Sequence, residues 1–364
     1  MSALTIVTNR AARDWRHCVQ KQLLAHLHGH QAKALADCSF AIALACDCRA
    51  RRVGVNVPTR ATPASSSRRM ERLLANERLE VPLAQQELAQ AVLQAWAGGT
   101  VLLLLDETPK ANDLRCMTIR VAYRHRALPL ASVCYRPDAP PQSMPQLVRR
   151  LLQQVHACLP PGSKPVLLAD RGLAWPTLID WCAEHGWHYL LRLQGQTKVR
   201  LADGRICTAR QLVSRPNRKW LGEADVFKKA GWRRAKVVAN WRADGSEPWL
   251  LVTDERASLR HCGTYAKRMW TEESFRDDKS SGFGWGDSQV NDPAHAGRLL
   301  LLMALAMLLA ASLGSEGNDD VWRKLEPRPQ RLSIVQWGLR WLAYAVTHGC
   351  FHLLHLDRLY LYPK

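Results

Sequence analysis

The chain has 364 residues, and its 51 Lys and Arg outnumber its 32 Asp and Glu, which gives a formal charge of +19. A hydrophobic content of 47% with 23% charged residues excludes an intrinsically disordered chain, and the length suffices for two or three domains. The excess of positive charge indicates a polyanionic partner, either nucleic acid or an anionic membrane surface.

The eleven cysteines are scattered along the chain without a CxxC pair. This pattern excludes a disulfide framework, and we expect reduced, buried thiols in a cytosolic protein. The alternative is a metal-binding knuckle of Cys46 and Cys48 with His26, His28 and His30 upstream. The first residues lack an apolar segment followed by a small-residue cleavage site, so we expect no secretory signal.

Residues 1–97 have apolar positions at helical spacing and are expected to form a helical DNA-binding domain. Two prolines and a run of serines predict a loop, after which Ser66 or Ser67 is expected to cap a basic helix over residues 68–79. A short basic helix after a Ser-rich turn suits a helix-turn-helix-like element that enters a DNA groove. The alternative is an ordinary solvated basic helix in an all-α domain.

Beyond Gly98 and Gly99 the pattern changes to alternating strands and helices, which predicts an α/β (α+β) fold with helices flanking a sheet. The expected elements are strands at 100–106, 115–125 and 127–135, a helix at 144–158, a strand at 166–170, a helix at 176–185 and a strand at 187–193.

Residues 194–258 interrupt this order and are expected to form an inserted antiparallel β module. Asp203-Gly204 and Asp244-Gly245 are typical hairpin turns, and the flanking segments alternate in polarity. Lys and Arg exceed Asp and Glu by eight in residues 196–260, which favours contact with a polyanion.

Helices are expected again at residues 264–279 and from about residue 293 to the end. The most apolar stretch, residues 299–313, is shorter than the roughly 18–20 residues that span a bilayer. We therefore expect a buried core helix and no membrane as a partner.

Three acidic residues are the candidate catalytic and metal-binding groups. Asp106 and Asp170 end apolar strands, and Glu272 lies on the helix expected at residues 264–279. Three convergent carboxylates would suit two Mg²⁺ or Mn²⁺ ions, which can activate a water or a 3′-OH and stabilise the leaving oxygen of a phosphodiester. The alternative is that the aspartates only terminate strands and that the helix is a solvent-facing one with ion pairs.

These residues resemble the DDE transposases of the insertion-sequence-four family. Tyr265, Arg268, Glu272 and Lys279 have the Y-x2-R-x3-E-x6-K spacing of that family's signature, and the two strand-ending aspartates match the first two acids of its triad. The resemblance covers roughly residues 98–310. It implies an RNase H-like core and selects Glu272 as the third acid.

Other charged residues lie close to these acids in the sequence. Glu107 and Glu273 are expected to point away from the site, and Asp277 and Asp278 to form surface ion pairs. Arg171, which directly follows the second aspartate, is expected to position DNA.

The resemblance implies a metal-dependent transposase that binds terminal inverted repeats, nicks the ends and transfers the 3′-OH ends to target DNA. It further implies a hairpin intermediate, a homodimer on DNA and a cytoplasmic, nucleoid-associated protein in a bacterium. Trp232, Trp241 and Trp249 are the candidates to stack a flipped base, and the sequence does not choose among them; Trp241 is included among the expected DNA-binding residues. The other residues assigned to DNA phosphates are Tyr265, Arg268, Arg276 and Lys279.

Two other functions stay open on the sequence: an RNase H-like nuclease without strand transfer, and a non-catalytic DNA-binding derivative of a transposase. The expected domains are a helical DNA-binding domain at 1–97, a core in two parts at 98–193 and 259–312, the inserted module at 194–258 and a C-terminal helical region at 313–364.

Overall fold

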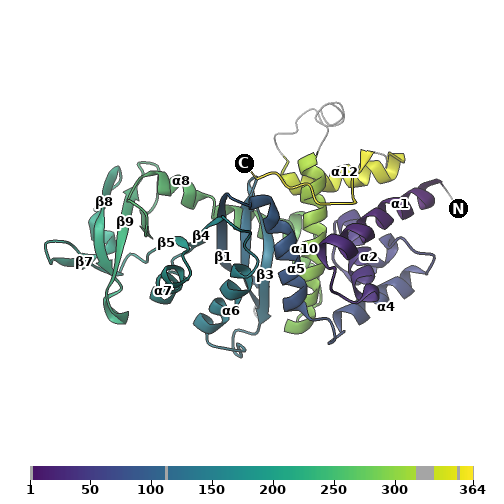
Figure 1. Ribbon diagram of the computed structural model, residues 1–364, viewed down its shortest axis with the longest axis horizontal. Coiled ribbons are helices and arrows are strands. Elements are labelled where there is room, and N and C mark those ends of the chain that lie inside the picture. The colour runs from purple at the N-terminus through teal and green to yellow at the C-terminus, as the bar shows by residue number, and fades with distance from the viewer. Residues whose placement is uncertain (1–2, 111–113, 317–331, 351–352, 364) are drawn as a thin grey trace.

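The computed structural model describes residues 3–110, 114–316, 332–350 and 353–363 (Figure 1). The apolar run that begins at residue 100 forms the central strand β1 (Thr100–Lys110) of a ten-stranded mixed sheet. β1 is antiparallel to β2 (Leu114–Tyr123) and parallel to β4 (Lys164–Ala169). With β3 (Arg126–Tyr135) and β5 (His188–Arg192), the spatial order β3-β2-β1-β4-β5 confirms the expected RNase H-like core.

β1 does not end at Asp106, and that expectation is wrong. The strand continues to Lys110 because β2 stays paired with it, from the pair Asp106–Thr118 to the pair Lys110–Leu114. The parallel partner β4 leaves earlier, so only one side of β1 loses its neighbour at the aspartate.

Five further strands extend the same sheet beyond β5 in the order β10-β9-β8-β6-β7. They confirm an inserted antiparallel β module. Gly204 (φ 81°) lies in the hairpin between β6 and β7, where a left-handed backbone favours glycine. The polarity pattern of the sequence does not predict β8. The strands are β6 (Lys198–Arg200), β7 (Ile206–Thr208), β8 (Arg218–Val226), β9 (Arg233–Trp241) and β10 (Trp249–Thr253).

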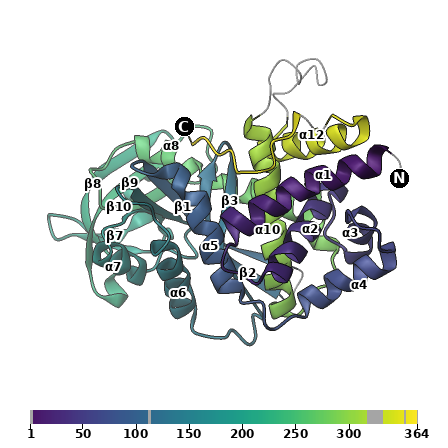
Figure 2. The same cartoon turned by 45° about the vertical axis from the view of Figure 1, so that its right-hand side comes forward.

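The N-terminal region is helical, as expected. It contains α1 (Ala3–Cys18), α2 (Gly29–Ala45), α3 (Ala50–Asn56), α4 (Pro63–Leu74) and α5 (Val81–Leu93), with α5 leading to the sheet (Figure 2).

The start of α4 corrects one expectation. The side chain of Thr62 accepts from the Ser65 N–H and caps the helix, so Ser66 and Ser67 are inside it rather than capping it. Pro63 occupies the first helical position, where its missing N–H costs nothing, so the helix begins before the serines.

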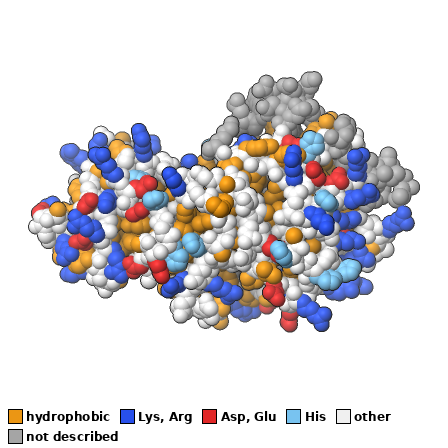
Figure 3. Space-filling view, in the orientation of Figure 1, with side chains coloured by type: hydrophobic (Ala, Val, Ile, Leu, Met, Phe, Trp, Pro, Cys, Tyr) orange, Lys and Arg blue, Asp and Glu red, His pale blue; other side chains and the backbone are white. Residues whose placement is uncertain are grey.

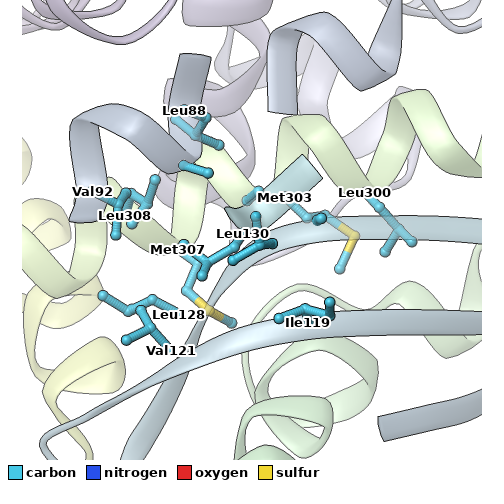
Figure 4. Packing of buried hydrophobic residues seen from close by; sticks show 14 of the residues in the cluster. Leu88, Val92, Ile119, Val121, Leu128, Leu130, Leu300, Met303, Met307 and Leu308 are labelled. Carbon is cyan, nitrogen blue, oxygen red and sulfur yellow. The ribbon is translucent and has the colours of Figure 1, made fainter. Parts of the chain in front are cut away.

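α10 (Pro293–Glu316) is the buried core helix that the sequence predicts. It is long and apolar enough to cross a membrane, but 94% of its most apolar 18-residue window is buried inside the protein. Figure 4 shows Leu300, Met303 and Met307 of α10 packed among apolar side chains of β2, β3 and α5.

The C-terminal part contains the helix α12 (Ile334–His348), and the expected helix over residues 317–331 lies outside the described residues. The described residues 354–363 contain no helix, so the expectation of helix to the end is wrong. This segment runs back over the core, where the Tyr360 N–H donates to Ser312 Oγ (2.7 Å) and the Tyr362 N–H to the Tyr123 hydroxyl (3.0 Å). Hydrogen bonds to the core, rather than bonds within a helix, satisfy this backbone.

The two faces of the sheet carry different helices. On one face, Leu104, Leu168 and Leu190 form a small apolar cluster with Tyr265 of α8 (Arg260–Ala266), which α9 (Met269–Arg276) follows. On the other face, α6 (Met144–His156) and α7 (Pro176–Glu184) join the main core. Alternate residues of a strand point to opposite faces, so Asp106 shares the α8 and α9 face with Leu104.

Positive charge gathers at the two ends of the molecule in the view of Figure 3, over the strands of the insertion and over the N-terminal helices. The middle of this view shows fewer charges and more apolar surface.

Candidate active site

The two aspartates lie next to each other at the end of a parallel strand pair. Leu105 of β1 and Ala169 of β4 are the last paired residues, and Asp106 and Asp170 directly follow them. The sheet therefore brings together two carboxylates that are 64 residues apart in the sequence. The pair lies where β4 ends and β1 continues beside β2 alone.

Arg268 joins the third acid to the first. Its Nη1 donates to Asp106 Oδ2 at 2.8 Å, and its Nη2 donates to Glu272 Oε1. The Arg268 side chain is 9% exposed and that of Asp106 14%, whereas the Glu272 side chain is 47% exposed. A buried guanidinium is thus shared by two of the three carboxylates.

The environment of Asp106 favours its protonated form. Burial raises the pKa of Asp106 to about 6, and the charges of Asp170 and Glu272 add to the rise, whereas Arg268 and the Glu107 N–H oppose it. Burial lowers the pKa of Arg268, but the surrounding carboxylates outweigh this effect and raise it above its usual value. The site therefore concentrates negative charge around one cation.

Tyr265 contacts the second aspartate. Its hydroxyl donates to Asp170 Oδ1 at 3.3 Å, its side chain is buried, and burial raises the pKa of the phenol. The ring of Trp249 packs edge-on against Tyr265 with the ring centroids 5.5 Å apart. Among the three candidate tryptophans, Trp249 is the one that packs directly against a residue in contact with a carboxylate of the site.

Trp241 lies in a different environment. Its indole N–H donates to the Gly245 carbonyl at 2.9 Å, and the Arg210 guanidinium lies 3.9 Å from the ring centroid. The hydrogen bond holds the turn between β9 and β10, and Arg210 covers the ring. Nothing in the sequence separates Trp241 from Trp249, because only strand pairing decides which one reaches the site.

The segment expected as one helix at residues 264–279 is interrupted. α8 ends at Ala266, α9 begins at Met269, and residues 277–281 form a π-helical turn. Arg268, the N-cap of α9, and Glu272 still lie on one side of the helix as an i,i+4 pair, whereas Lys279 lies in the π-helical turn outside the regular helix.

The two cations near the C-terminal end of this segment differ. Arg276 is exposed and pairs with Glu273 at 2.9 Å. Lys279 is half-buried, and burial lowers its pKa while Asp278 opposes the shift. In the part of the chain that the structure describes, neither Arg276 nor Lys279 forms a hydrogen bond or ion pair with Asp106, Asp170 or Glu272.

Asp277 and Asp278 are not surface residues, and that expectation is wrong. Both are buried, and they pair with Arg126 and Arg120 at 2.6 Å each. The sequence signal for this arrangement is an arginine at position 120 within an apolar strand, because a buried cation requires an acidic partner. Glu107, by contrast, points away from the site as expected and accepts from the Tyr135 hydroxyl.

Arg171 follows Asp170 and lies on the surface. It pairs with Glu247 at 3.0 Å, and Arg192 pairs with the other oxygen of the same carboxylate at 2.6 Å. Arg171 also lines a groove of about 340 Å³ with Trp175, Lys198 and Lys228. The second aspartate thus adjoins a basic surface between the core and the insertion.

The carboxylates have the chemistry to hold a divalent metal, but their grouping is loose. Carboxylate oxygens are the ligands that Mg²⁺ and Mn²⁺ prefer, and the raised pKa of Asp106 includes a repulsion from neighbouring carboxylates that a bound cation would relieve. In the described part of the chain, no three His, Cys, Asp or Glu side chains gather closely enough to define a metal site. Arg268 supplies the cationic partner of Asp106 and Glu272 instead.

A mixed sheet of this order with acids at its rim defines an RNase H-like class of proteins. The profile of the family described as Transposase DDE domain matches residues 109–309, more than half of the chain, and the chain belongs to this family. The match includes Asp170 and Glu272 and begins three residues after Asp106. No curated protein matches the chain.

Family membership establishes the general activity. Transposases of this kind cleave DNA and transfer its ends, DNA is their partner, and DDE domains generally use divalent metal ions.

Proposed function

We propose that the chain is a transposase of the insertion-sequence-four family that cleaves the ends of its element with Asp106, Asp170 and Glu272. The observation that carries this proposal is the position of the two aspartates directly after the last β1–β4 pair, with Arg268 linking the first of them to Glu272. A bound metal would be held by these three carboxylates and would supply activation of a water or 3′-OH.

The other signature residues would bind and orient DNA. Tyr265 holds Asp170 through its hydroxyl and is itself held by Trp249, so it would orient the carboxylate and the strand beside it. The Nε of Arg268 has no hydrogen-bond partner among the described residues, so this guanidinium has a donor left for a phosphate once it shifts. Arg276 and Lys279 would contact phosphates further along the strand.

Two basic surfaces would carry the DNA. One is the groove beside Arg171, whose Lys198 and Lys228 could pair with phosphates while Trp175 could stack a base. The other is α3 and α4 of the N-terminal domain, whose exposed arginines fit the helix-turn-helix-like role for binding terminal repeats. A flipped base at a hairpin end would stack on Trp249 more readily than on Trp241, whose ring is already covered by Arg210.

The test uses DNA that flanks the gene, cut to include candidate inverted repeats, with the purified chain and Mg²⁺. Asp106→Asn, Asp170→Asn and Glu272→Gln should each lower end cleavage at least a hundredfold without unfolding the protein. The matched controls are Glu107→Gln and Glu273→Gln, which alter the adjacent acids, and they should retain activity. Equal cleavage by all five variants would reject the site.

The reaction products distinguish the three candidate functions: transposition, DNA cleavage alone and DNA binding alone. Joining of cleaved ends to a target plasmid supports transposition, whereas cleavage without joining supports a nuclease. Binding without cleavage supports a non-catalytic derivative. A terminal hairpin would be seen as a covalently closed end on a denaturing gel, and sedimentation of the DNA complex would report the proposed homodimer.

A further inference from the structure

Two buried ion pairs lie beside the helix that carries Glu272. We propose that Asp277 and Asp278 are positioning residues, which hold α9 through Arg126 and Arg120 so that Glu272 faces Asp106. The role depends on the proposed function, because Glu272 is a proposed catalytic residue. These four side chains, together with Ser274, form the α9 anchor.

The first ion pair fastens the end of the segment to β2. Arg120 Nη2 lies 2.6 Å from Asp278 Oδ2, and both side chains are 5% exposed. The guanidinium carbon of Arg120 also lies 4.7 Å from the centroid of the Phe275 ring on α9. One β2 arginine therefore contacts α9 and the π-helical turn at the same time.

The second ion pair fastens the same segment to the start of β3. Arg126 Nε lies 2.6 Å from Asp277 Oδ2, and the Asp277 side chain is 1% exposed. One turn earlier, Ser274 Oγ accepts from the Ala127 N–H at 2.7 Å. Consecutive acids thus reach two different strands.

The strand register connects this anchor to the first aspartate. Arg120 pairs with Leu104 across β1 and β2, and Leu104 lies two residues before Asp106 on the same face. Asp106 pairs with Thr118 in the same ladder. The anchor therefore sets the position of α9 relative to the strand pair that carries Asp106.

Glu272 depends on such an anchor because its own contacts are few. Its side chain is 47% exposed and its ion pair is with Arg268. Lys267 and Arg268, between α8 and α9, keep right-handed helical dihedrals, and the Thr271 N–H donates to the Arg268 carbonyl, so α8 constrains the N-terminal side of α9. The ion pairs of Asp277 and Asp278 add a second constraint, on the C-terminal side of α9, to the position of Glu272.

Ion pairs suit this task better than apolar contacts. A buried pair contributes little net stability, but its short-range geometry is strict, and breaking one partner is costly. Rotating a helix by one residue turns it by about 100°, which would remove both Asp277 and Asp278 from their arginines. The anchor therefore permits one placement of α9.

The experiment compares Asp278→Asn and Asp277→Asn with two control variants in the full chain. Asp180→Asn on α7 removes the partner of Arg233 on β9, and Trp187→Phe removes a partly buried hydrogen bond to His156, both away from α9. Hydrogen exchange of peptides covering residues 264–283, thermal midpoint, and end cleavage as a function of Mg²⁺ are measured for each. Rates are expressed per folded molecule.

We expect the α9-anchor variants to raise exchange in residues 264–276, to lower cleavage about tenfold or more and to raise the half-saturating Mg²⁺ concentration. Both controls should leave exchange in residues 264–276, cleavage and Mg²⁺ dependence unchanged; Trp187→Phe should lose stability, whereas the exposed Asp180 pair contributes little. If an aspartate variant does not fold, Ser274→Ala, which removes a single hydrogen bond, should show the same changes in weaker form.

Anchor variants that lose stability like the controls, with unchanged exchange, Mg²⁺ dependence and cleavage, would overturn the positioning role. Glu272→Gln separates the two proposals. If it is inactive while the anchor variants behave as controls, only the positioning role fails; if it is active, the proposed site itself fails.

Discussion

Asp106 and Asp170 directly follow Leu105 and Ala169, the last residues that pair β1 with β4. The β1–β4 pairing brings the two aspartates close together, although they are 64 residues apart in the sequence, at the point where β4 ends and β1 continues beside β2. The charge of Asp170 makes ionisation of Asp106 more costly, and Arg268 lies where it offsets that cost. The stability of this rim therefore depends on the balance between its carboxylates and a single buried cation.

Removing the shared guanidinium should destabilise the fold. Arg268→Ala leaves Asp106 buried without its cation, and loss of one partner of a buried pair costs about 3–5 kcal/mol. The free energy of unfolding in urea measures this. The double variant Asp106→Asn/Arg268→Ala should lose less than the sum of the two single variants, and strict additivity would show that the pair contributes nothing.

Asp106 should make the stability depend on pH. The unfolded chain ionises Asp106 near its ordinary pKa of about 3.9, whereas the folded chain does so at a pKa of about 6. Because the pKa is higher in the folded chain, protonation of Asp106 stabilises the fold. The wild-type chain should therefore lose stability relative to Asp106→Asn as the pH rises through this range. The loss is roughly 3 kcal/mol at most.

Urea unfolding in the presence of a chelator, from pH 4 to pH 8, checks this expectation. A stability difference between the two proteins that stays constant with pH would contradict the raised pKa.

Trp249 and Trp241 should differ in their effect on cleavage. Trp249→Ala removes the ring that supports Tyr265 beside Asp170, so we expect about a tenfold loss or more in end cleavage. Trp241→Ala removes a hydrogen bond that holds the turn at Gly245, so we expect a smaller effect on cleavage. The thermal midpoints of both variants show how much of each loss comes from unfolding. A larger loss of end cleavage for Trp241→Ala than for Trp249→Ala would indicate that Trp241 is the stacking residue.

The arginines of α4 should determine how DNA binding depends on salt. Arg68 and Arg72 are exposed, and removal of each phosphate contact should reduce the slope of log K against log salt by about 0.9. Arg68→Gln/Arg72→Gln should therefore lower the slope by about two in a fluorescence anisotropy titration. Arg149→Gln/Arg150→Gln on α6 removes the same charge elsewhere. An equal change in slope for this variant would contradict specific DNA binding by α4.

The crossing of α3 and α4 should not tolerate a larger residue. A Cβ at Gly54 would lie 2.2 Å from Ser67 Oγ and 2.6 Å from the Pro63 carbonyl oxygen. Gly54→Ala should lower the free energy of unfolding of the N-terminal helices by about 1–3 kcal/mol through overpacking. Gly29→Ala is the control, since a Cβ there meets nothing within 4 Å. Equal stability of the two variants would contradict the tight crossing.

Strand and helix order could be predicted from the sequence because local patterns specify it. Continuous apolar runs and hairpin dipeptides correctly predict strands at β1 and β4 and an antiparallel insertion, although β8 within it is not predicted. The end of β1 could not be predicted, because it depends on β2 remaining paired after β4 departs. The cap of α4 could not be predicted either, because several hydroxyl side chains compete locally and backbone geometry selects Thr62.

Local sequence patterns indicated three candidate carboxylates and an alternating order of strands and helices, and the resemblance of these residues to a transposase family implied an RNase H-like core. Which groups meet depends on the folded chain. Folding placed Arg268 between two acids, brought Trp249 rather than Trp241 to Tyr265, and buried Asp277 and Asp278 against β2 and β3. Periodicity is a local property, whereas pairing of buried charges depends on strands and helices that are far apart in the chain.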